Sequence, residues 1–60
     1  MRFLLVTDKN GTTYSLNRDL INRVIETKEG LMIVMSEGVI IYTKEKLLEF
    51  NSRLNSNISF

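Results

Sequence analysis

The apolar residues of this chain occur in short runs, and the first runs are each followed by a turn that contains glycine. The first run lies in residues 2–7 and leads into Asn10-Gly11. This dipeptide is a strong signal for a two-residue type I′ hairpin loop, because both residues tolerate positive φ. Pairing outward from that loop places Leu5 opposite Leu16. One face of the predicted hairpin then collects four side chains: Phe3, Leu5, Tyr14 and Leu16.

A second hairpin is predicted in residues 30–43, where the apolar runs LMIVM and VIIY flank SEG. With Glu37-Gly38 as the loop, Ile33 lies opposite Tyr42 and Met35 opposite Ile40. Met32, Val34 and Ile41 then share the second face. The C-terminal helix can cover one face, which leaves the other to the N-terminal hairpin or to a second copy of the chain. Because large exposed apolar patches usually mark contact sites, we predict that the second face is a contact surface. The predicted oligomer or partner interface consists of Met32, Val34, Val39 and Ile41.

Residues 17–27 are compatible with two structures. Leu20, Ile21, Val24 and Ile25 recur at helical spacing, and Asn17 is a suitable N-cap. The alternative is a turn at residues 17–19 followed by a strand at residues 20–27, which the β-branched residues favour. The pattern alone leaves both interpretations open.

The period changes after Thr43, which is a candidate N-cap. Leu47, Phe50 and Leu54 form the apolar stripe of an amphipathic helix of about three turns. The polar residues 55–60 are expected to fray or to dock loosely. The predicted fold is therefore α+β: a single small domain, residues 1–60, with an antiparallel sheet of four to five strands and one C-terminal amphipathic helix.

Composition limits what can stabilise such a chain. Its 60 residues include no Cys and no His, so neither a disulfide nor a typical zinc site is expected. A domain of this size buries only about 60% of the surface that its unfolded chain exposes. Oligomerisation is the remaining common route to stability. We therefore expect a homodimer or higher oligomer. The absence of cysteine makes the cytoplasm the expected compartment. No apolar stretch is long enough for membrane insertion.

The same composition argues against enzymatic chemistry and against a cofactor. The usual general base and thiol nucleophile are missing, and no motif places a serine or lysine for catalysis. The net charge is only +1 and the basic residues are scattered, so nucleic acid is not an expected partner. Tyr14 and Tyr42 are interpreted as packing residues rather than as a base-stacking platform.

Two arginines are candidates for charge contacts with a ligand or partner. In the strand interpretation, Arg23 lies between Ile21 and Ile25 on an apolar face, where it would be half-buried and would pair with a carboxylate. Glu26, Glu37 or a partner's acidic residue could supply that carboxylate. The predicted charge contacts are Arg18 and Arg23.

The order of these signals resembles that of the flagellar FlbD and swarming-motility SwrD family. The likeness runs over residues 5–50 and comprises NG-x-x-Y-x-LN-x-x-L-I, then V-I-E-T-K-E, an apolar strand, SEG, a second apolar strand and YTKEKLLEF. The chain has Lys28-Glu29 where the family tends to have Pro-Asp. The resemblance implies a strand at residues 20–27 and a cytoplasmic bacterial accessory protein that supports flagellar motor output without enzymatic activity. It carries over no functional residue.

Three functions follow as hypotheses. The first is a non-enzymatic interaction protein that self-associates through its apolar sheet and acts by binding another protein. The second is a small inhibitor, encoded by a phage or mobile element, that binds a host factor or a small anionic ligand near Arg18 or Arg23. The third and weakest is an RNA-binding sheet protein built around Tyr14 and Tyr42.

Overall fold

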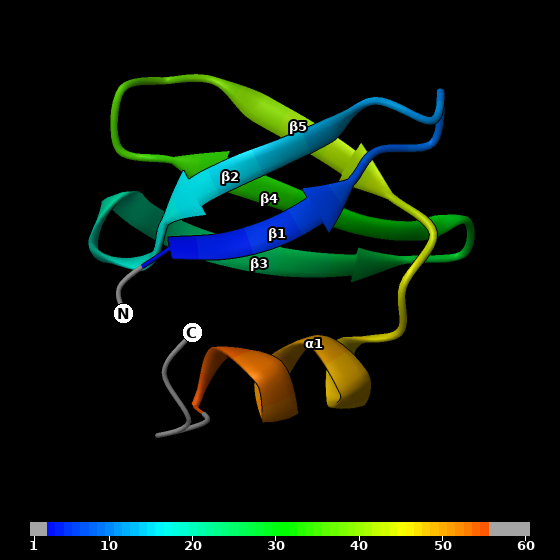
Figure 1. Ribbon diagram of the computed structural model, residues 1–60. Coiled ribbons are helices and arrows are strands. Elements are labelled where there is room, and N and C mark those ends of the chain that lie inside the picture. Colours follow the sequence, from blue (N-terminus) through cyan, green and yellow to red (C-terminus); the bar gives the residue numbers. More distant parts are fainter. Residues whose placement is uncertain (1–2, 56–60) are drawn as a thin grey trace.

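The computed structural model describes residues 3–55, which form five strands, one short 3₁₀ turn and one α-helix (Figure 1). The expected α+β class is confirmed, but the strands form two antiparallel sheets instead of one: β1-β2 and β3-β4-β5. The expected fraying of residues 55–60 falls, apart from Asn55, outside the described residues. In chain order the elements are β1 (Phe3–Thr7), β2 (Thr13–Asn17), η1 (Arg18–Leu20), β3 (Ile21–Thr27), β4 (Gly30–Met35), β5 (Ile40–Thr43) and α1 (Leu47–Leu54).

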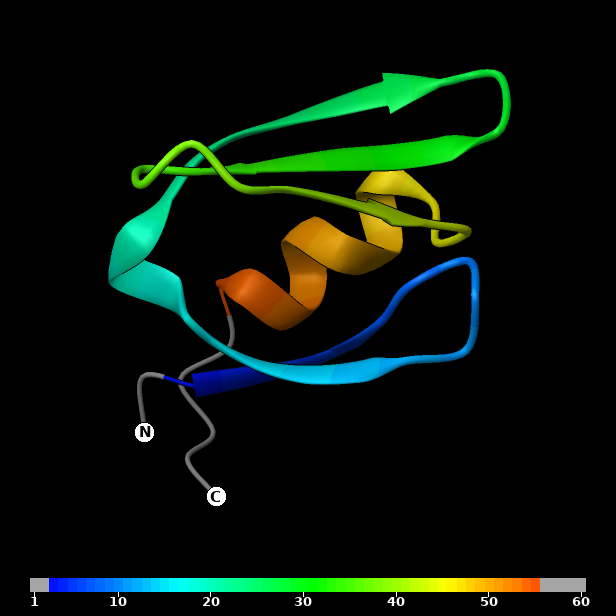
Figure 2. The same cartoon turned by 90° about the horizontal axis from the view of Figure 1, so that it is seen from above.

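The two sheets face each other, and α1 lies between them along the side of β1 and β3 (Figures 1 and 2). Hydrogen bonds join the parts. The backbone N–H of Lys9, at the tip of the first hairpin, donates to the carbonyl of Tyr42 in β5 at 2.8 Å. The Arg53 guanidinium of α1 donates to the carbonyl of Leu5 in β1. The first bond thus links the tip of the first hairpin to the β3-β4-β5 sheet, and the second links α1 to the β1-β2 sheet. Within residues 3–55 no helix is long and apolar enough to cross a membrane.

Residues 17–27 form a short turn and a strand, as one of the two interpretations predicted. Asn17 Oδ1 accepts a hydrogen bond from the backbone N–H of Asp19 at 2.9 Å, which stabilises the turn η1. In β3, Ile21 pairs with Met35 and Arg23 pairs with Val34, so the register shifts between them. This irregularity is a β-bulge, which adds one residue to one strand of a pair.

The first hairpin does not contain the predicted type I′ loop. That turn requires positive φ at both central residues, whereas among residues 3–55 only glycines have positive φ, Gly11 at 90° among them. The Gly11 N–H donates to the Asp8 carbonyl at 3.0 Å, and the Asp8 N–H donates to the Thr12 carbonyl at 2.8 Å. This is a type I turn followed by a glycine bulge.

The extra loop residue shifts the predicted register of the first hairpin by one position. Leu4, not Leu5, lies opposite Leu16. A shift of one residue exchanges the faces of a strand, so Leu4 and Val6 point toward the core. Phe3 and Leu5, which were predicted to share a face with Leu16, are 54% and 64% exposed.

The second hairpin repeats the same loop and the same correction. The Gly38 N–H donates to the Met35 carbonyl at 2.9 Å, and the Met35 N–H donates to the Val39 carbonyl at 2.8 Å. Ile33 therefore lies opposite Ile41 instead of Tyr42. The prediction that Ile41 belongs to the exposed face is wrong, because Ile41 is only 6% exposed within this single chain.

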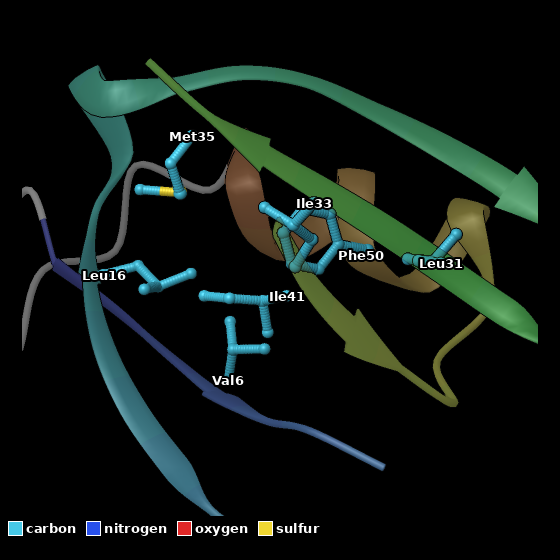
Figure 3. Packing of buried hydrophobic residues seen from close by; sticks show 7 residues of the cluster. All are labelled: Val6, Leu16, Leu31, Ile33, Met35, Ile41 and Phe50. Carbon is cyan, nitrogen blue, oxygen red and sulfur yellow. The ribbon is translucent and has the colours of Figure 1, made fainter. Parts of the chain in front are cut away.

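The core lies between the two sheets and the helix (Figure 3). Phe50 of α1 is fully buried, and Leu47 and Leu54 pack against the same cluster, which confirms the predicted helical stripe. The helix begins at Leu47, later than expected. Thr43 is not its N-cap, because Thr43 is the last residue of β5 and Lys46 occupies the N-cap position. The buried apolar side chains are Val6, Leu16, Leu31, Ile33, Met35, Ile41 and Phe50.

Candidate interaction surface and arginine groove

The face of the β3-β4-β5 sheet that points away from the core is apolar, and we call it the outer face. Strand pairing arranges its side chains in two rows that run across the strands. Three of the apolar residues are substantially exposed: Ile25 at 38%, Ile40 at 42% and Tyr42 at 45%. The first row is Ile25, Met32 and Tyr42, and the second is Arg23, Val34 and Ile40.

The tip of the first hairpin adjoins the β5 side of the outer face. The Lys9 ammonium nitrogen lies 5.1 Å from the centre of the Tyr42 ring, within the range of a cation–π contact. Together with the backbone hydrogen bond between the same two residues, this contact links the tip to β5. The outer face thus has a cationic border at Lys9 and another at Arg23.

The predicted interface residues are distributed unequally over the structure. Met32 and Val34 lie on the outer face and are half-buried. Val39 lies in the loop before β5 and is 51% exposed. Ile41 lies in the core. Ile40 and Tyr42 lie on the outer face. The predicted register assigned them to the opposite face, because it was wrong by one residue.

The two predicted charge contacts, Arg18 and Arg23, line the same groove of about 530 Å³ between β3 and α1. Arg18 Nη1 donates to the carbonyl of Leu54 at 2.9 Å and so ties η1 to the end of the helix. Both apolar and polar side chains line the groove. Its lining comprises Arg18, Asp19, Ile21, Asn22, Arg23, Val24, Leu47, Asn51 and Leu54.

Arg23 differs from its predicted environment. The bulge places it on the outer face, where it is exposed instead of half-buried. Neither Glu26 nor Glu37 pairs with it, and among residues 3–55 its side chain makes no hydrogen bond or ion pair. Glu26 instead accepts a hydrogen bond from the backbone N–H of Leu47 at 3.1 Å. Arg23 thus borders both the outer face and the groove.

A smaller groove of about 220 Å³ lies between the tip of the first hairpin and β5, and both Tyr14 and Tyr42 line it. Asp8 also lines it, but its carboxylate is occupied. Asp8 Oδ1 accepts hydrogen bonds from the N–H groups of Thr12 and Asn10, both at 2.9 Å, and Oδ2 accepts from the Tyr14 hydroxyl at 3.3 Å. The Thr12 N–H is the main cause that lowers the pKa of Asp8. This carboxylate therefore stabilises the turn of the first hairpin.

Within residues 3–55 no three His, Cys, Asp or Glu residues come together in a way that could hold a metal ion. Comparison of the chain with models of protein families, with curated proteins and with solved structures finds no match.

Proposed function

We propose that this chain is a non-enzymatic interaction protein that self-associates through its outer face and acts by binding another protein. The observation that carries the proposal is the cluster of five apolar side chains on the outer face. Ile25, Ile40 and Tyr42 are exposed next to the half-buried Met32 and Val34. On a soluble protein, a contiguous apolar patch of this kind usually marks a contact site.

The geometry of the outer face suits contact with a second copy of the same sheet. Two sheets that stack face to face lie about 10 Å apart and interdigitate their side chains. In a two-fold symmetric dimer the same patch meets itself, so one apolar surface suffices for both subunits. Burial of this face would add to the limited core of a small domain. The resemblance to the FlbD and SwrD family makes bacterial flagellar motility the cellular setting to test first.

The experiment is the native mass, measured by light scattering across a dilution series. We expect a dimer or larger species that dissociates on dilution. Ile40→Glu places a charge on the outer face and should shift the species to a monomer that remains folded. Leu48→Glu is the matched control, because Leu48 is an 85% exposed apolar residue on the helix. A native protein that is monomeric at every concentration would overturn self-association.

A second candidate function is that of a small inhibitor, encoded by a phage or mobile element, that holds a small anionic ligand. The presence of Arg18 and Arg23 at one groove favours it. A ligand that binds only the native state raises the melting temperature. A panel of nucleotides and phosphorylated metabolites should then include compounds that stabilise the native protein but not Arg23→Glu. An unchanged melting temperature across the panel would remove this candidate.

A further inference from the structure

The groove between β3 and α1 combines the edge of a sheet with one side of a helix. Among the described strands, β3 has a neighbour only on its β4 side. The other edge of such a strand presents N–H and C=O groups to which a further strand can add. Four consecutive residues of β3, residues 21–24, line the groove. The helix lines it with Leu47, Asn51 and Leu54, whose spacing of i, i+4 and i+7 places them on one side of α1.

The lining offers both apolar and polar contacts. Ile21, Val24, Leu47 and Leu54 are half-buried and pack against the core. Asn22, Arg23 and Asn51 are exposed around them. The volume of about 530 Å³ lies within the range of roughly 300 to 1,000 Å³ that is typical of ligand pockets. An occupant with both apolar and polar side chains would match this lining.

The charge of the groove indicates the sign of the occupant. Two arginines and one aspartate line it, which gives a formal balance of +1. Arg23 is the exposed cation, and no carboxylate of residues 3–55 pairs with it. The bulge beside Asn22 lies at the same place, and bulges are frequent next to binding sites because they re-aim side chains.

We infer that the groove binds an extended acidic peptide of a partner protein, which adds as a strand to the edge of β3. Four residues of a strand span about 13 Å, so a peptide of similar length can follow residues 21–24. Its main chain would bond to β3, its apolar side chains would contact Leu47 and Leu54, and an acidic side chain would meet Arg23. The inference rests on the proposed function, because it names the chemistry of the protein partner.

The test begins with selection of random peptides, about six residues long, displayed on phage against the full chain. We expect enrichment of peptides that alternate apolar and acidic residues. Arg23→Glu should weaken an enriched peptide about tenfold or more, since a like charge then opposes the acidic side chain. Lys28→Glu makes the same charge change in the β3-β4 turn, outside the groove, and should leave the affinity unchanged.

Two further measurements separate strand addition from other modes of binding. In strand pairing only every second residue directs its N–H and C=O toward the neighbouring strand. Two peptides are therefore compared, one with methylated backbone nitrogens at its odd-numbered residues and one at its even-numbered residues. Methylation should abolish binding of one of them and not of the other. Asn51→Trp should block the groove, whereas Ser52→Trp, one position along the helix and outside the lining, should not.

The inference is overturned if no acidic peptide is enriched, if methylation of either set of alternate nitrogens has the same effect, or if binding survives in Arg23→Glu and Asn51→Trp. It is also overturned if inorganic phosphate alone competes as well as the peptide. Ile40→Glu separates this inference from self-association. Loss of the oligomer with retained peptide binding supports the groove, whereas loss of peptide binding in Ile40→Glu would place the peptide on the outer face and contradict it.

Discussion

The backbone N–H of Leu47, the first residue of α1, donates a hydrogen bond to Glu26 Oε2 at 3.1 Å. Lys46 occupies the N-cap position and makes no side-chain capping bond. The first N–H groups of a helix have no partner within the helix, and a carboxylate there also interacts favourably with the helix dipole. A strand residue therefore caps the helix, and the contact fixes one end of α1 to the β3 side of the groove.

Removal of this cap should destabilise the protein modestly. Glu26→Ala is expected to lower the free energy of unfolding by about 1 kcal/mol, the usual cost of losing an N-cap acceptor. Glu26→Gln keeps an acceptor oxygen and should recover part of the loss. Urea unfolding followed by circular dichroism measures both. Glu29→Ala, in the exposed β3-β4 turn, is the control, and equal losses for Glu26→Ala and Glu29→Ala would show that the cap contributes nothing.

Gly30 is the glycine at which substitution should be most harmful. Its φ is 145°, and a Cβ atom there would lie 2.0 Å from the carbonyl oxygen of Thr43 in the neighbouring strand. Because that oxygen belongs to the backbone, relief requires the strands to separate. We expect Gly30→Ala to cost about 3 kcal/mol or more.

Gly11→Ala provides the comparison for Gly30→Ala. Gly11 also has positive φ, but nothing lies within 4 Å of a Cβ atom built there. Only the backbone conformation is then penalised, at about 1–2 kcal/mol. Urea unfolding of the two variants should separate them clearly. Similar losses would mean that the close approach of Gly30 to Thr43 does not exist in solution.

Asp8 should make the stability of the first hairpin depend on pH. The Thr12 N–H, followed by smaller contributions from Asn10, Tyr14 and Gly11, holds the pKa of Asp8 below the usual value of 3.8, although partial desolvation opposes this shift. A carboxylate whose pKa is lower in the folded state stabilises it above the unfolded pKa, and this contribution is lost as pH falls through the folded value. The contribution is therefore complete at neutral pH and disappears below pH 3.8.

The measurement for Asp8 is the difference in urea midpoint between the native protein and Asp8→Ala from pH 7 downward. The difference should be constant near neutral pH and should narrow below pH 3.8, where the native carboxylate becomes protonated. Asp8→Asn keeps an acceptor oxygen without the titration, so its midpoint relative to Asp8→Ala should not change over the same range. A gap between native protein and Asp8→Ala that widens on acidification would contradict the sign of the pKa shift.

The pattern of β3 explains why residues 17–27 could not be assigned from sequence alone. In a regular strand, inward-facing residues are two positions apart. The bulge beside Asn22 adds a residue, so Ile21 and Val24 both pack against the core at a spacing of three. That spacing is also the signature of a helix. The ambiguity in the sequence is thus a direct consequence of the bulge.

Both hairpin registers were predicted one residue out, because a two-residue loop was assumed where a type I turn with a glycine bulge forms. The sequence contains part of the signal for this turn. A type I′ loop at Glu37-Gly38 would require positive φ at Glu37, which is uncommon for a residue with a long side chain. Asp8 likewise begins a turn that its own side chain stabilises. Arg18 and Arg23 were identified from charge and spacing, but the helix side of their groove follows from tertiary packing that no local pattern encodes.

The corrected register of the second hairpin can be tested with two adjacent isoleucines. Ile41 is 6% exposed and belongs to the core, whereas Ile40 is 42% exposed on the outer face. Ile41→Ala should therefore cost about 2–5 kcal/mol, the range for truncation of a buried isoleucine. Ile40→Ala should cost less than about 1 kcal/mol in the monomer. Because Ile40 is expected to be covered in the oligomer, urea unfolding must be measured at a concentration where light scattering reports a single chain. The register predicted with Glu37-Gly38 as the loop places Ile40 and Ile33 on one face and Ile41 on the other. A larger loss for Ile40→Ala than for Ile41→Ala would therefore support that register.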